Sequence, residues 1–347
     1  MGLKLLHSAD WHLGSSFSGF SEDQRAVLNR AHRKIPGRIL EIAHGEAVDM
    51  VLLSGDLLEE NCGREWIDLL KHTLREFQVP VFVAPGNHDF CCPGSPWVEE
   101  VWPENVHIFT RGLESVVVPE LDCRVYGAGY QSMDCPPLLR DFRAEGRETY
   151  CVAVLHGDPV VSNSPCCPVT TAQIRESGLN YLALGHIHKS GSVSAGETLC
   201  AWPGCPMGRG WDETGEKGVF IVSLEAGVNT RTVGLDGPRF QELEWDVENL
   251  DDLEQVLPAG ATEDFYRITL TGFGTPRTEI LGARFSHIPN LVIRDRTQPP
   301  LPAWDDLTED SLEGTYFRLL RQSKDPRAEL ALEISRKLLA GREVPLP

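Results

Sequence analysis

The sequence lacks the features of secreted and membrane-spanning proteins. No stretch approaches the ~18 consecutive apolar residues of a transmembrane helix, and the segment from Met1 has no basic region followed by a long apolar one. Cysteine is also scarce, with 10 residues among 347 and no Cys-x-x-Cys pair, which excludes a disulfide scaffold. We therefore expect a cytoplasmic protein with reduced thiols and no membrane partner.

Basic residues are few for a protein that binds nucleic acid through a charged surface. Lys and Arg number 32 against 51 Asp and Glu, so the formal net charge is -19. A field of that sign repels nucleic acid and anionic membranes, which argues against a sequence-independent phosphate binder. Because charges are screened within ~8 Å at physiological salt, a locally positive site can still attract a phosphate.

Short apolar runs alternate with amphipathic stretches up to about residue 190, in a composition that is ordinary for a globular protein. Amphipathic spacing predicts helices over 22–45, 64–77 and 169–178. Strand followed by helix, repeated, predicts a sheet covered by helices and hence an α/β fold. The runs that we interpret as buried strands are Leu3–Leu6, Met50–Leu53, Val79–Val83, Val152–Leu155 and Tyr181–Leu184.

The second half of the chain is mostly β-structure, and its pattern indicates a second domain. Glycine-separated strands continue from Ser192 to about Val247, where an acidic, helix-prone segment begins. A length of 347 residues favours two domains at ~150 residues each. We therefore expect a first domain over 1–247 and a smaller one over 248–347. The latter contains strand candidates at 266–270 and 291–294, a proline-rich link at 299–302 and a helical tail.

Side chains that bind metals follow each of the five predicted strands. Ligands of open α/β sheets collect outside the carboxyl ends of the strands, where loops from separate strands meet. These groups are therefore expected to share one pocket. They are Asp10-Trp11-His12, Gly55-Asp56, Gly86-Asn87-His88-Asp89, His156-Gly157-Asp158 and Gly185-His186-Ile187-His188.

The chemistry of these donors indicates two divalent cations. Carboxylate, imidazole and amide groups without a thiolate suit ions such as manganese better than structural zinc. Seven donors exceed what one four- to six-coordinate ion needs, so we expect two ions that share a bridging carboxylate. Manganese is the expected metal, with magnesium, iron and zinc left open. Two ions ~3.5–4 Å apart are the apparatus for in-line attack on a phosphoryl group.

In this order the motifs resemble the calcineurin-like metallophosphoesterase superfamily. The start Ser8-Ala9-Asp10-Trp11-His12-Leu13-Gly14 and the block from Pro203 to Gly210 with Glu216-Lys217-Gly218 resemble its SbcD and YhaO branch of DNA-repair exonucleases. The resemblance covers about residues 3–235. It implies a four-layer β-sandwich flanked by helices, with a small α+β C-terminal capping domain. It also implies hydrolysis of DNA by a metal-activated hydroxide.

The resemblance also implies a role for each donor, carried over position by position. Asp56 is the expected bridge between the ions. His88 is no ligand but stabilises the transition state or protonates the leaving oxygen, with Asp89 either a structural residue or its orienting partner. One ion would be held by Asp10, His12, Asp56 and His188, and the other by Asp56, Asn87, His156 and His186.

Several positions leave more than one interpretation open. Archaeal and eukaryotic relatives carry a second histidine three residues after the bridging aspartate, where this chain has Glu59. We expect Glu59 to be a solvated carboxylate, with a role in substrate handling as the alternative. Lys189, Arg209 and Lys217 are candidate DNA contacts. The adjacent pairs Cys91-Cys92 and Cys166-Cys167 are expected to be ordinary thiols rather than a redox switch.

The apolar residues of the tail fall at helical spacing, from Leu312 to Leu320 and from Leu330 to Leu338. These two helices either pack on their own domain or, by the resemblance, dock on the coiled coil of an SMC-like ATPase of the SbcC type. A homodimer is also left open. A phosphatase or phosphodiesterase of small molecules and a non-catalytic scaffold are the competing functions.

Overall fold

The computed structural model describes residues 2–225, 227–260, 262–276, 278–298 and 310–339. The chain divides into two compact units. The first comprises Met1–Gln241 with Glu263–Phe265, and the second Glu242–Thr262 with Tyr266–Pro347. The predicted proline-rich link at 299–302 lies outside the described residues. No helix in the described parts of the chain is both long and apolar enough to cross a membrane.

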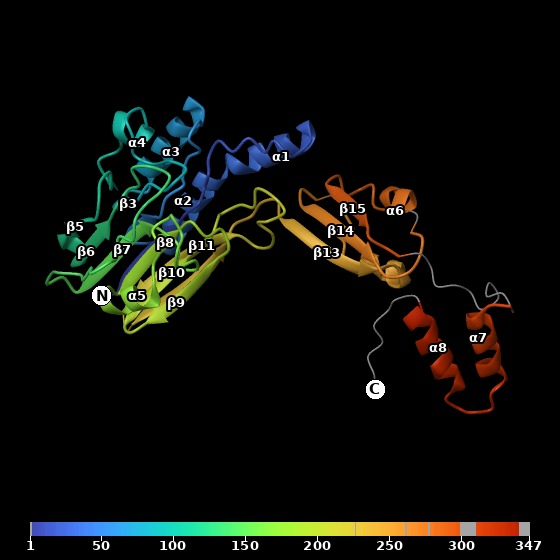
Figure 1. The fold of residues 1–347 in the computed structure, drawn as a ribbon. Helices are drawn as coiled ribbons and strands as arrows, with labels where there is room; N and C mark the ends of the chain where they lie inside the picture. Colours follow the sequence, from blue (N-terminus) through green and yellow to red (C-terminus); the bar gives the residue numbers. More distant parts are fainter. Residues whose placement is uncertain (1, 226, 261, 277, 299–309, 340–347) are drawn as a thin grey trace. The chain divides into compact units, whose positions relative to one another are not determined.

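The first unit contains two six-stranded sheets (Figure 1). One sheet has the order β12 (Val228–Gly234), β11 (Gly218–Leu224), β1 (Leu3–Ser8), β2 (Met50–Leu53), β3 (Val81–Val83) and β4 (Val106–Ile108). The other has the order β5 (Glu114–Val118), β6 (Cys123–Gly127), β7 (Tyr150–His156), β8 (Tyr181–Gly185), β10 (Thr198–Trp202) and β9 (Gly191–Ala195). The runs β1–β4 and β6–β7–β8–β10 are parallel within their sheets.

Alternating side chains of the buried strands enter different cores, which stacks the sheets and helices in four layers. Leu6 of β1 packs in the core beneath helices α1 (Glu22–His32), α2 (Ile35–Glu46) and α3 (Arg64–Glu76). Leu5 points the other way, into the core between the two sheets. A third core places α5 (Thr171–Glu176) against the outer face of the second sheet. The expected β-sandwich flanked by helices is confirmed.

The predicted helix over 22–45 is wrong in one respect, because the structure contains two helices there. A capping box of Ser21 and Gln24 starts α1, which ends at His32. Pro36 stands in the first turn of α2, where its missing N–H needs no partner, and it prevents a continuous helix. The short helices α4 (Pro96–Glu99) and η1 (Pro119–Leu121) complete the first unit.

The second unit is built on a three-stranded sheet with the order β13 (Phe240–Asp246), β14 (Phe265–Thr271) and β15 (Leu291–Asp295). Its core contains Leu253, Ile268 and Phe285, together with neighbouring apolar side chains. The helix η2 (Val247–Gln255) and α6 (Thr278–Arg284) accompany this sheet. Helices α7 (Leu312–Gln322) and α8 (Ala328–Leu339) contact each other as a pair.

Candidate metal centre

The loops that follow the parallel strands run side by side and bring the predicted donors together. After β1 and β2 the backbones continue to pair, with Asp10 N–H donating to Gly55 O (3.0 Å) and His12 N–H to Asp56 O (2.8 Å). A Cβ on Gly86 would collide with Oδ1 of Asp56, so only glycine lets the loop after β3 approach this closely. The site therefore follows from strand order and from one close backbone approach.

One group of donors consists of Asp10, His12 and His188. Their ligand atoms all lie within 4.8 Å of one another. The Nε2 atoms of His12 and His188 are 3.2 Å apart. Atoms that bind one octahedral cation at ~2.1 Å are themselves ~3 Å apart, so this spacing fits a shared ion.

A second group consists of Asn87, His156 and His186. Oδ1 of Asn87 lies 2.9 Å from Nε2 of His156 and 3.2 Å from Nδ1 of His186. The amide oxygen and two imidazole nitrogens thus converge on one point. Nε2 of His186 faces away from this point, at 3.9 Å from Oδ2 of Asp158.

Asp56 lies between the two groups. Its Oδ2 atom is 3.7 Å from Nε2 of His12 and 3.4 Å from Nε2 of His156. Its other oxygen, Oδ1, accepts a hydrogen bond from the backbone N–H of His88 (2.9 Å). One carboxylate oxygen is therefore held by the backbone, and the other is directed at both donor groups, as a bridging ligand requires.

Oxygen acceptors lie beside Nδ1 of three of the histidines. Nδ1 of His12 is 3.1 Å from a carboxylate oxygen of Glu59, and Nδ1 of His188 is 2.6 Å from one of Glu213. Nδ1 of His156 is 2.9 Å from the backbone oxygen of Ser54. Because carboxylate and carbonyl oxygens only accept, these contacts favour a proton on Nδ1 and leave Nε2 for a metal, although Nη2 of Arg209 also lies 3.2 Å from Nδ1 of His188.

Four of the donor residues have backbone conformations that side chains rarely adopt. The φ angles are 54° at Asp10, 49° at His12, 51° at Asp56 and 91° at His186. Such left-handed conformations cost ~1–3 kcal/mol each for residues other than glycine. Of the ten non-glycine residues with such angles among the described residues, these four are predicted ligands, and the other six lie at helix ends and in other loops.

The donor side chains leave hydrogen-bonding capacity unused that a bound divalent cation would satisfy. Asp10 Oδ1 accepts from the backbone N–H of His186 (3.0 Å), whereas the buried Oδ2 has no hydrogen-bond partner among the described residues. Burial raises the pKa of Asp10 to about 7, and the negative charge of Asp56 adds to this rise against the opposing effect of His188. A buried carboxylate with an orphaned oxygen beside facing lone pairs needs a cation.

Asp89 supports the loops and does not orient His88. Its carboxylate accepts hydrogen bonds from the backbone N–H groups of Asp56, Leu57, Leu58 and Gly86, at 2.7–3.3 Å. These contacts agree with the structural role that we expect for Asp89, and no contact to His88 is among them. Asp158 is similar, since it accepts from the N–H groups of Val160 and Val161.

Glu59 is not the freely solvated carboxylate that we expected, because its side chain is mostly enclosed and paired. Only 26% of the side chain is exposed, and it contacts His12, His88 and Arg209. Arg209, a candidate DNA contact, is instead paired with Glu59 and Glu213. Sequence reasoning missed Glu213, whose only local signal is its position four residues after Arg209 in the glycine- and proline-rich loop.

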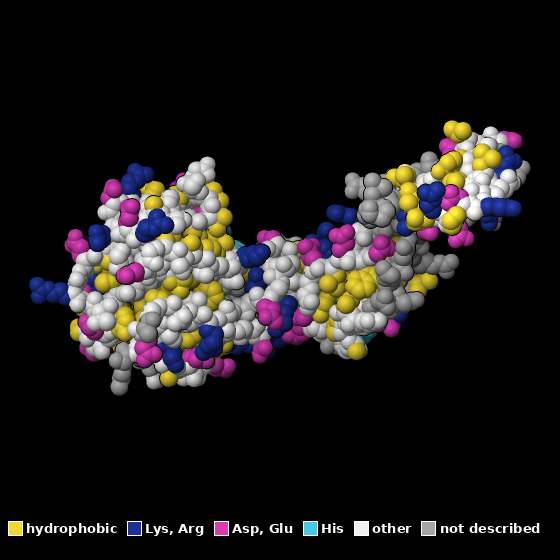
Figure 2. Space-filling model, turned by 90° about the horizontal axis from the view of Figure 1, so that it is seen from below, with side chains coloured by type: hydrophobic (Ala, Val, Ile, Leu, Met, Phe, Trp, Pro, Cys, Tyr) yellow, Lys and Arg dark blue, Asp and Glu magenta, His cyan; other side chains and the backbone are white. Residues whose placement is uncertain are grey.

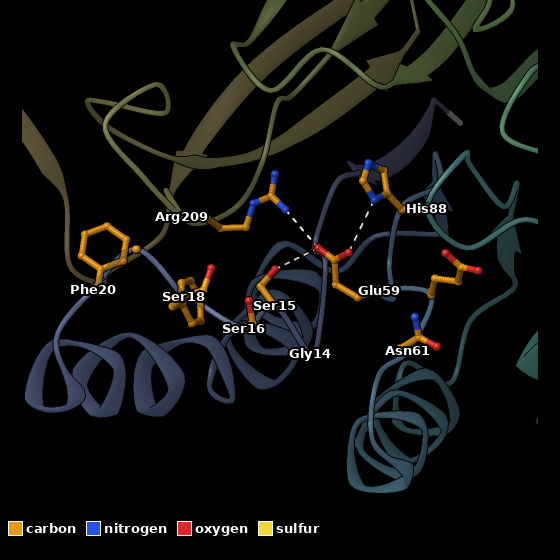
Figure 3. Close-up of a pocket in the computed structure, with 12 residues that line it drawn as sticks. Gly14, Ser15, Ser16, Ser18, Phe20, Glu59, Asn61, His88 and Arg209 are labelled. Carbon is orange, nitrogen blue, oxygen red and sulfur yellow. Dashed lines mark hydrogen bonds and ion pairs between the residues drawn. The ribbon is translucent and has the colours of Figure 1, made fainter.

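A cavity of about 570 Å³ opens beside these residues (Figure 3). His88 lines it with 44% of its side chain exposed, in contrast to the buried His12 and His156. The 14–20 loop forms another wall. His88 is thus accessible to a molecule in the cavity, although one of its ring nitrogens also lies within 4.8 Å of ligand atoms of His12 and Asp56.

An α/β sandwich with such donors at the carboxyl ends of its strands is the architecture of a metal-dependent hydrolase. The chain belongs to the calcineurin-like phosphoesterase family, whose model matches residues 3–190. Proteins of this family use a two-metal centre. The family predicted from the motifs is confirmed.

Three relatives show how far the similarity extends. The uncharacterized metallophosphoesterase YhaO of Bacillus subtilis is 32% identical over 274 residues, which are 73% of this chain and 64% of that protein. The D component of the nuclease SbcCD from Staphylococcus saprophyticus is 32% identical over 108 residues, 28% of this chain and 27% of that protein. The 3',5'-cyclic adenosine monophosphate phosphodiesterase CpdA of Haemophilus influenzae is 27% identical over 166 residues, 47% of this chain and 58% of CpdA. The chain spans less than two thirds of each.

Proposed function

We propose that this chain is a two-metal phosphodiesterase that hydrolyses DNA as an exonuclease in DNA repair. The observation that carries the proposal is Oδ2 of Asp56, which lies 3.7 Å from Nε2 of His12 and 3.4 Å from Nε2 of His156. Two cations that share such a carboxylate are spaced for in-line displacement at phosphorus. Manganese is the metal that we expect, because the donors are carboxylate, imidazole and amide.

Each donor has a stated role in this proposal. The bound ions supply positive charge at the phosphoryl oxygens and lower the pKa of the attacking water. Backbone N–H groups hold Asp10 and Asp56 so that one oxygen of each is left for metal. Asp10, His12, Asp56 and His188 would hold one ion, and Asp56, Asn87, His156 and His186 the other.

His88 is the catalytic residue in this proposal. It lies at the cavity, and its Nδ1 is 3.5 Å from Oε2 of Glu59, which leaves Nε2 for the substrate. The hydrogen bond to Glu59 raises the pKa of His88, although partial burial opposes the rise. A protonated imidazole at this place stabilises the transition state or gives its proton to the leaving oxygen.

The negative charge of the chain does not exclude a DNA substrate. Two divalent ions bring four positive charges and the carboxylates of Asp10 and Asp56 return two negative ones, so the site is locally positive. The relatives named as parts of the nuclease SbcCD support DNA as the substrate. In this proposal residues 1–247 form the catalytic domain, and residues 248–347 form a capping domain that restricts which DNA ends reach the metals.

A phosphodiesterase of small nucleotides is the second candidate. It is favoured by the CpdA relative and by Arg209, whose guanidinium is paired with Glu59 and Glu213 and is not left to hold a DNA backbone. Only Lys189 and Lys217 then remain of the predicted DNA contacts. Nothing in the ligand geometry separates the two substrates, because both contain the same diester.

A comparison of substrates tests the proposal directly. The purified chain is incubated with manganese and with end-labelled single-stranded DNA, linear duplex DNA or cyclic AMP. We expect mononucleotide release from DNA ends that stops with a chelator. Cleavage of cyclic AMP alone would replace the nuclease with the second candidate.

The terminal helices are the proposed binding site for an SMC-like ATPase of the SbcC type. Phe317 and Leu332 are buried in the pair, whereas 84% of Leu312, 62% of Leu319 and 58% of Leu330 are exposed. Figure 2 shows apolar side chains on the surface of this pair beside charged ones. Co-purification with a co-expressed ATPase, lost on deletion of residues 310–339, is the expected result.

A non-catalytic scaffold would need no metal. All seven predicted donors are present, and backbone hydrogen bonds hold the carboxylates of Asp10 and Asp56, which argues against this alternative. Metal analysis of the purified protein separates the two, since a scaffold binds no manganese at stoichiometric levels.

A further inference from the structure

Five side chains form a closed ring around one of the donor groups. Nδ1–H of His12 donates to Oε1 of Glu59 (3.1 Å), which also accepts from Nη1 of Arg209 (3.3 Å). Nη2 of Arg209 donates to Oε1 of Glu213 (2.8 Å), which accepts from Nδ1–H of His188 (2.6 Å). The two Nε2 atoms, 3.2 Å apart, close the ring. We call these residues the side-chain ring.

Glu59 connects the side-chain ring to His88. Its Oε2 atom lies 3.5 Å from Nδ1 of His88, while Oε1 accepts from Ser15 (Figure 3). The same Oε1 atom accepts from Nδ1 of His12. The rings of His12 and His88 are themselves in edge-to-face contact, with centroids 4.8 Å apart and planes at 77°. One carboxylate therefore holds two imidazoles, of which one belongs to the metal donors and the other faces the cavity.

The surroundings of Glu59 keep it charged and in place. Burial would raise its pKa, but hydrogen bonds from His12 and His88 outweigh burial and hold the pKa below its usual range. Arg209, with 19% of its side chain exposed, fixes the carboxylate from a third side and is itself fixed by the buried Glu213. Ion pairs this well enclosed are less screened than surface pairs and give a defined geometry.

We propose that Glu59 is a positioning residue that orients His12 for the metal and, at the same time, orients His88 to protonate the leaving oxygen. The inference deepens the proposed phosphodiesterase and rests on it for the part that concerns His88. A carboxylate suits this task because it has two acceptor oxygens and no proton to donate. A single amide or imidazole at this place can serve only one of the two rings.

The first test is metal binding to the metal-free protein. Manganese is titrated calorimetrically into the wild-type chain, Glu59→Ala and Glu60→Ala. Glu60 is the matched control because it is exposed and has no hydrogen bond or ion pair among the described contacts. We expect Glu59→Ala to weaken one of the two binding events ~10–100-fold, the range for residues that orient a metal-binding histidine, and Glu60→Ala to change neither.

The second test uses two diesters at saturating manganese. Thymidine 5'-(4-nitrophenyl phosphate) releases a phenolate that needs no proton, whereas the dinucleotide TpT releases an alkoxide that does. We expect Glu59→Ala to lower kcat at least tenfold more for TpT than for the nitrophenyl ester. Glu59→Gln, which keeps the side-chain volume, is expected to retain the fold and to show one of the two losses, because its amide oxygen serves one ring.

Two results would overturn the proposal. One is unchanged affinity of Glu59→Ala for both ions. The other is an equal loss of kcat on both substrates, which would make Glu59 an ordinary structural ion-pair partner. If the wild-type chain hydrolyses neither diester while Glu59→Ala still weakens manganese binding, the phosphodiesterase fails and the orientation of His12 stands.

Discussion

Nε2 of His12 and Nε2 of His188 lie 3.2 Å apart, although 176 residues separate the two histidines in the sequence. Each ring donates its Nδ1 proton to a glutamate, so two lone pairs face each other. That arrangement is unfavourable without a positive charge between them. A cation bound between the two nitrogens would satisfy both, and the left-handed backbone of Asp10 and His12 lies at the same donors.

Divalent metal should stabilise the fold. Ions that bind the native chain and not the unfolded one raise the free energy of unfolding by ~2.7 kcal/mol at 100 times Kd. We expect the Tm of the metal-free protein to rise on addition of manganese and to return with a chelator. Differential scanning calorimetry checks this, and a Tm insensitive to manganese would show that the donors bind no ion.

Loss of the bridging ligand Asp56, or of His186, a ligand of one ion only, should remove metal and activity together. Asp56→Asn and His186→Ala are expected to weaken manganese binding more than the ~10–100-fold typical of supporting residues. Asp68→Asn is the control, because Asp68 pairs only with exposed Arg64 on α3. Inductively coupled plasma mass spectrometry of the purified variants measures the number of manganese ions bound per chain. Full occupancy in Asp56→Asn would contradict the shared-ligand assignment.

His88→Ala should separate catalysis from metal binding. Because His88 is half-exposed at the cavity while the donors are largely enclosed, its removal leaves the ligands in place. We expect two ions per chain and a fall in kcat of ~10²–10⁴-fold, the usual contribution of general acid catalysis. Loss of both ions in this variant would instead make His88 a ligand.

Asp89→Asn should destabilise the fold through the loop after β2. The native carboxylate accepts from the N–H groups of Asp56, Leu57, Leu58 and Gly86. An asparagine leaves one accepting oxygen and presents an NH₂ group to the other donors. Burial raises the pKa of Asp89 to about 7, so the comparison is made well above pH 7, where the carboxylate is charged. Hydrogen bonds to charged groups are worth ~1.5–3 kcal/mol each, so we expect a loss of at least ~2 kcal/mol. Urea unfolding of metal-free protein measures it, and a change within ~0.5 kcal/mol would refute the loop-support role.

The strands and the donors were predictable because they depend on short stretches of sequence. The run Met50–Leu53 is apolar on both faces, so it reads as a buried parallel strand, and Asp56 follows at the end where ligands gather. The orientation of these donors depends on chain segments far apart. Glu213 contacts His188 only because the loop after β10 folds back, and no sequence periodicity predicts that contact.

Charge was the least predictable feature. Glu59 looked like a solvated carboxylate, and Arg209 like a DNA contact, because an isolated charged residue in a loop is usually exposed. The folded chain instead encloses both in the side-chain ring, with 26% and 19% of their side chains exposed. Only the packing of the loops after β1, β2 and β10 against one another creates these partners. A sequence pattern that covers one segment at a time does not contain that information.

The paired metal centre can be tested most directly by electron paramagnetic resonance during manganese titration of the metal-free protein. We expect an exchange-coupled signal that is complete at two ions per chain and disappears in Asp56→Asn. Two equivalents that give only the spectrum of isolated manganese ions in the wild-type chain would contradict it.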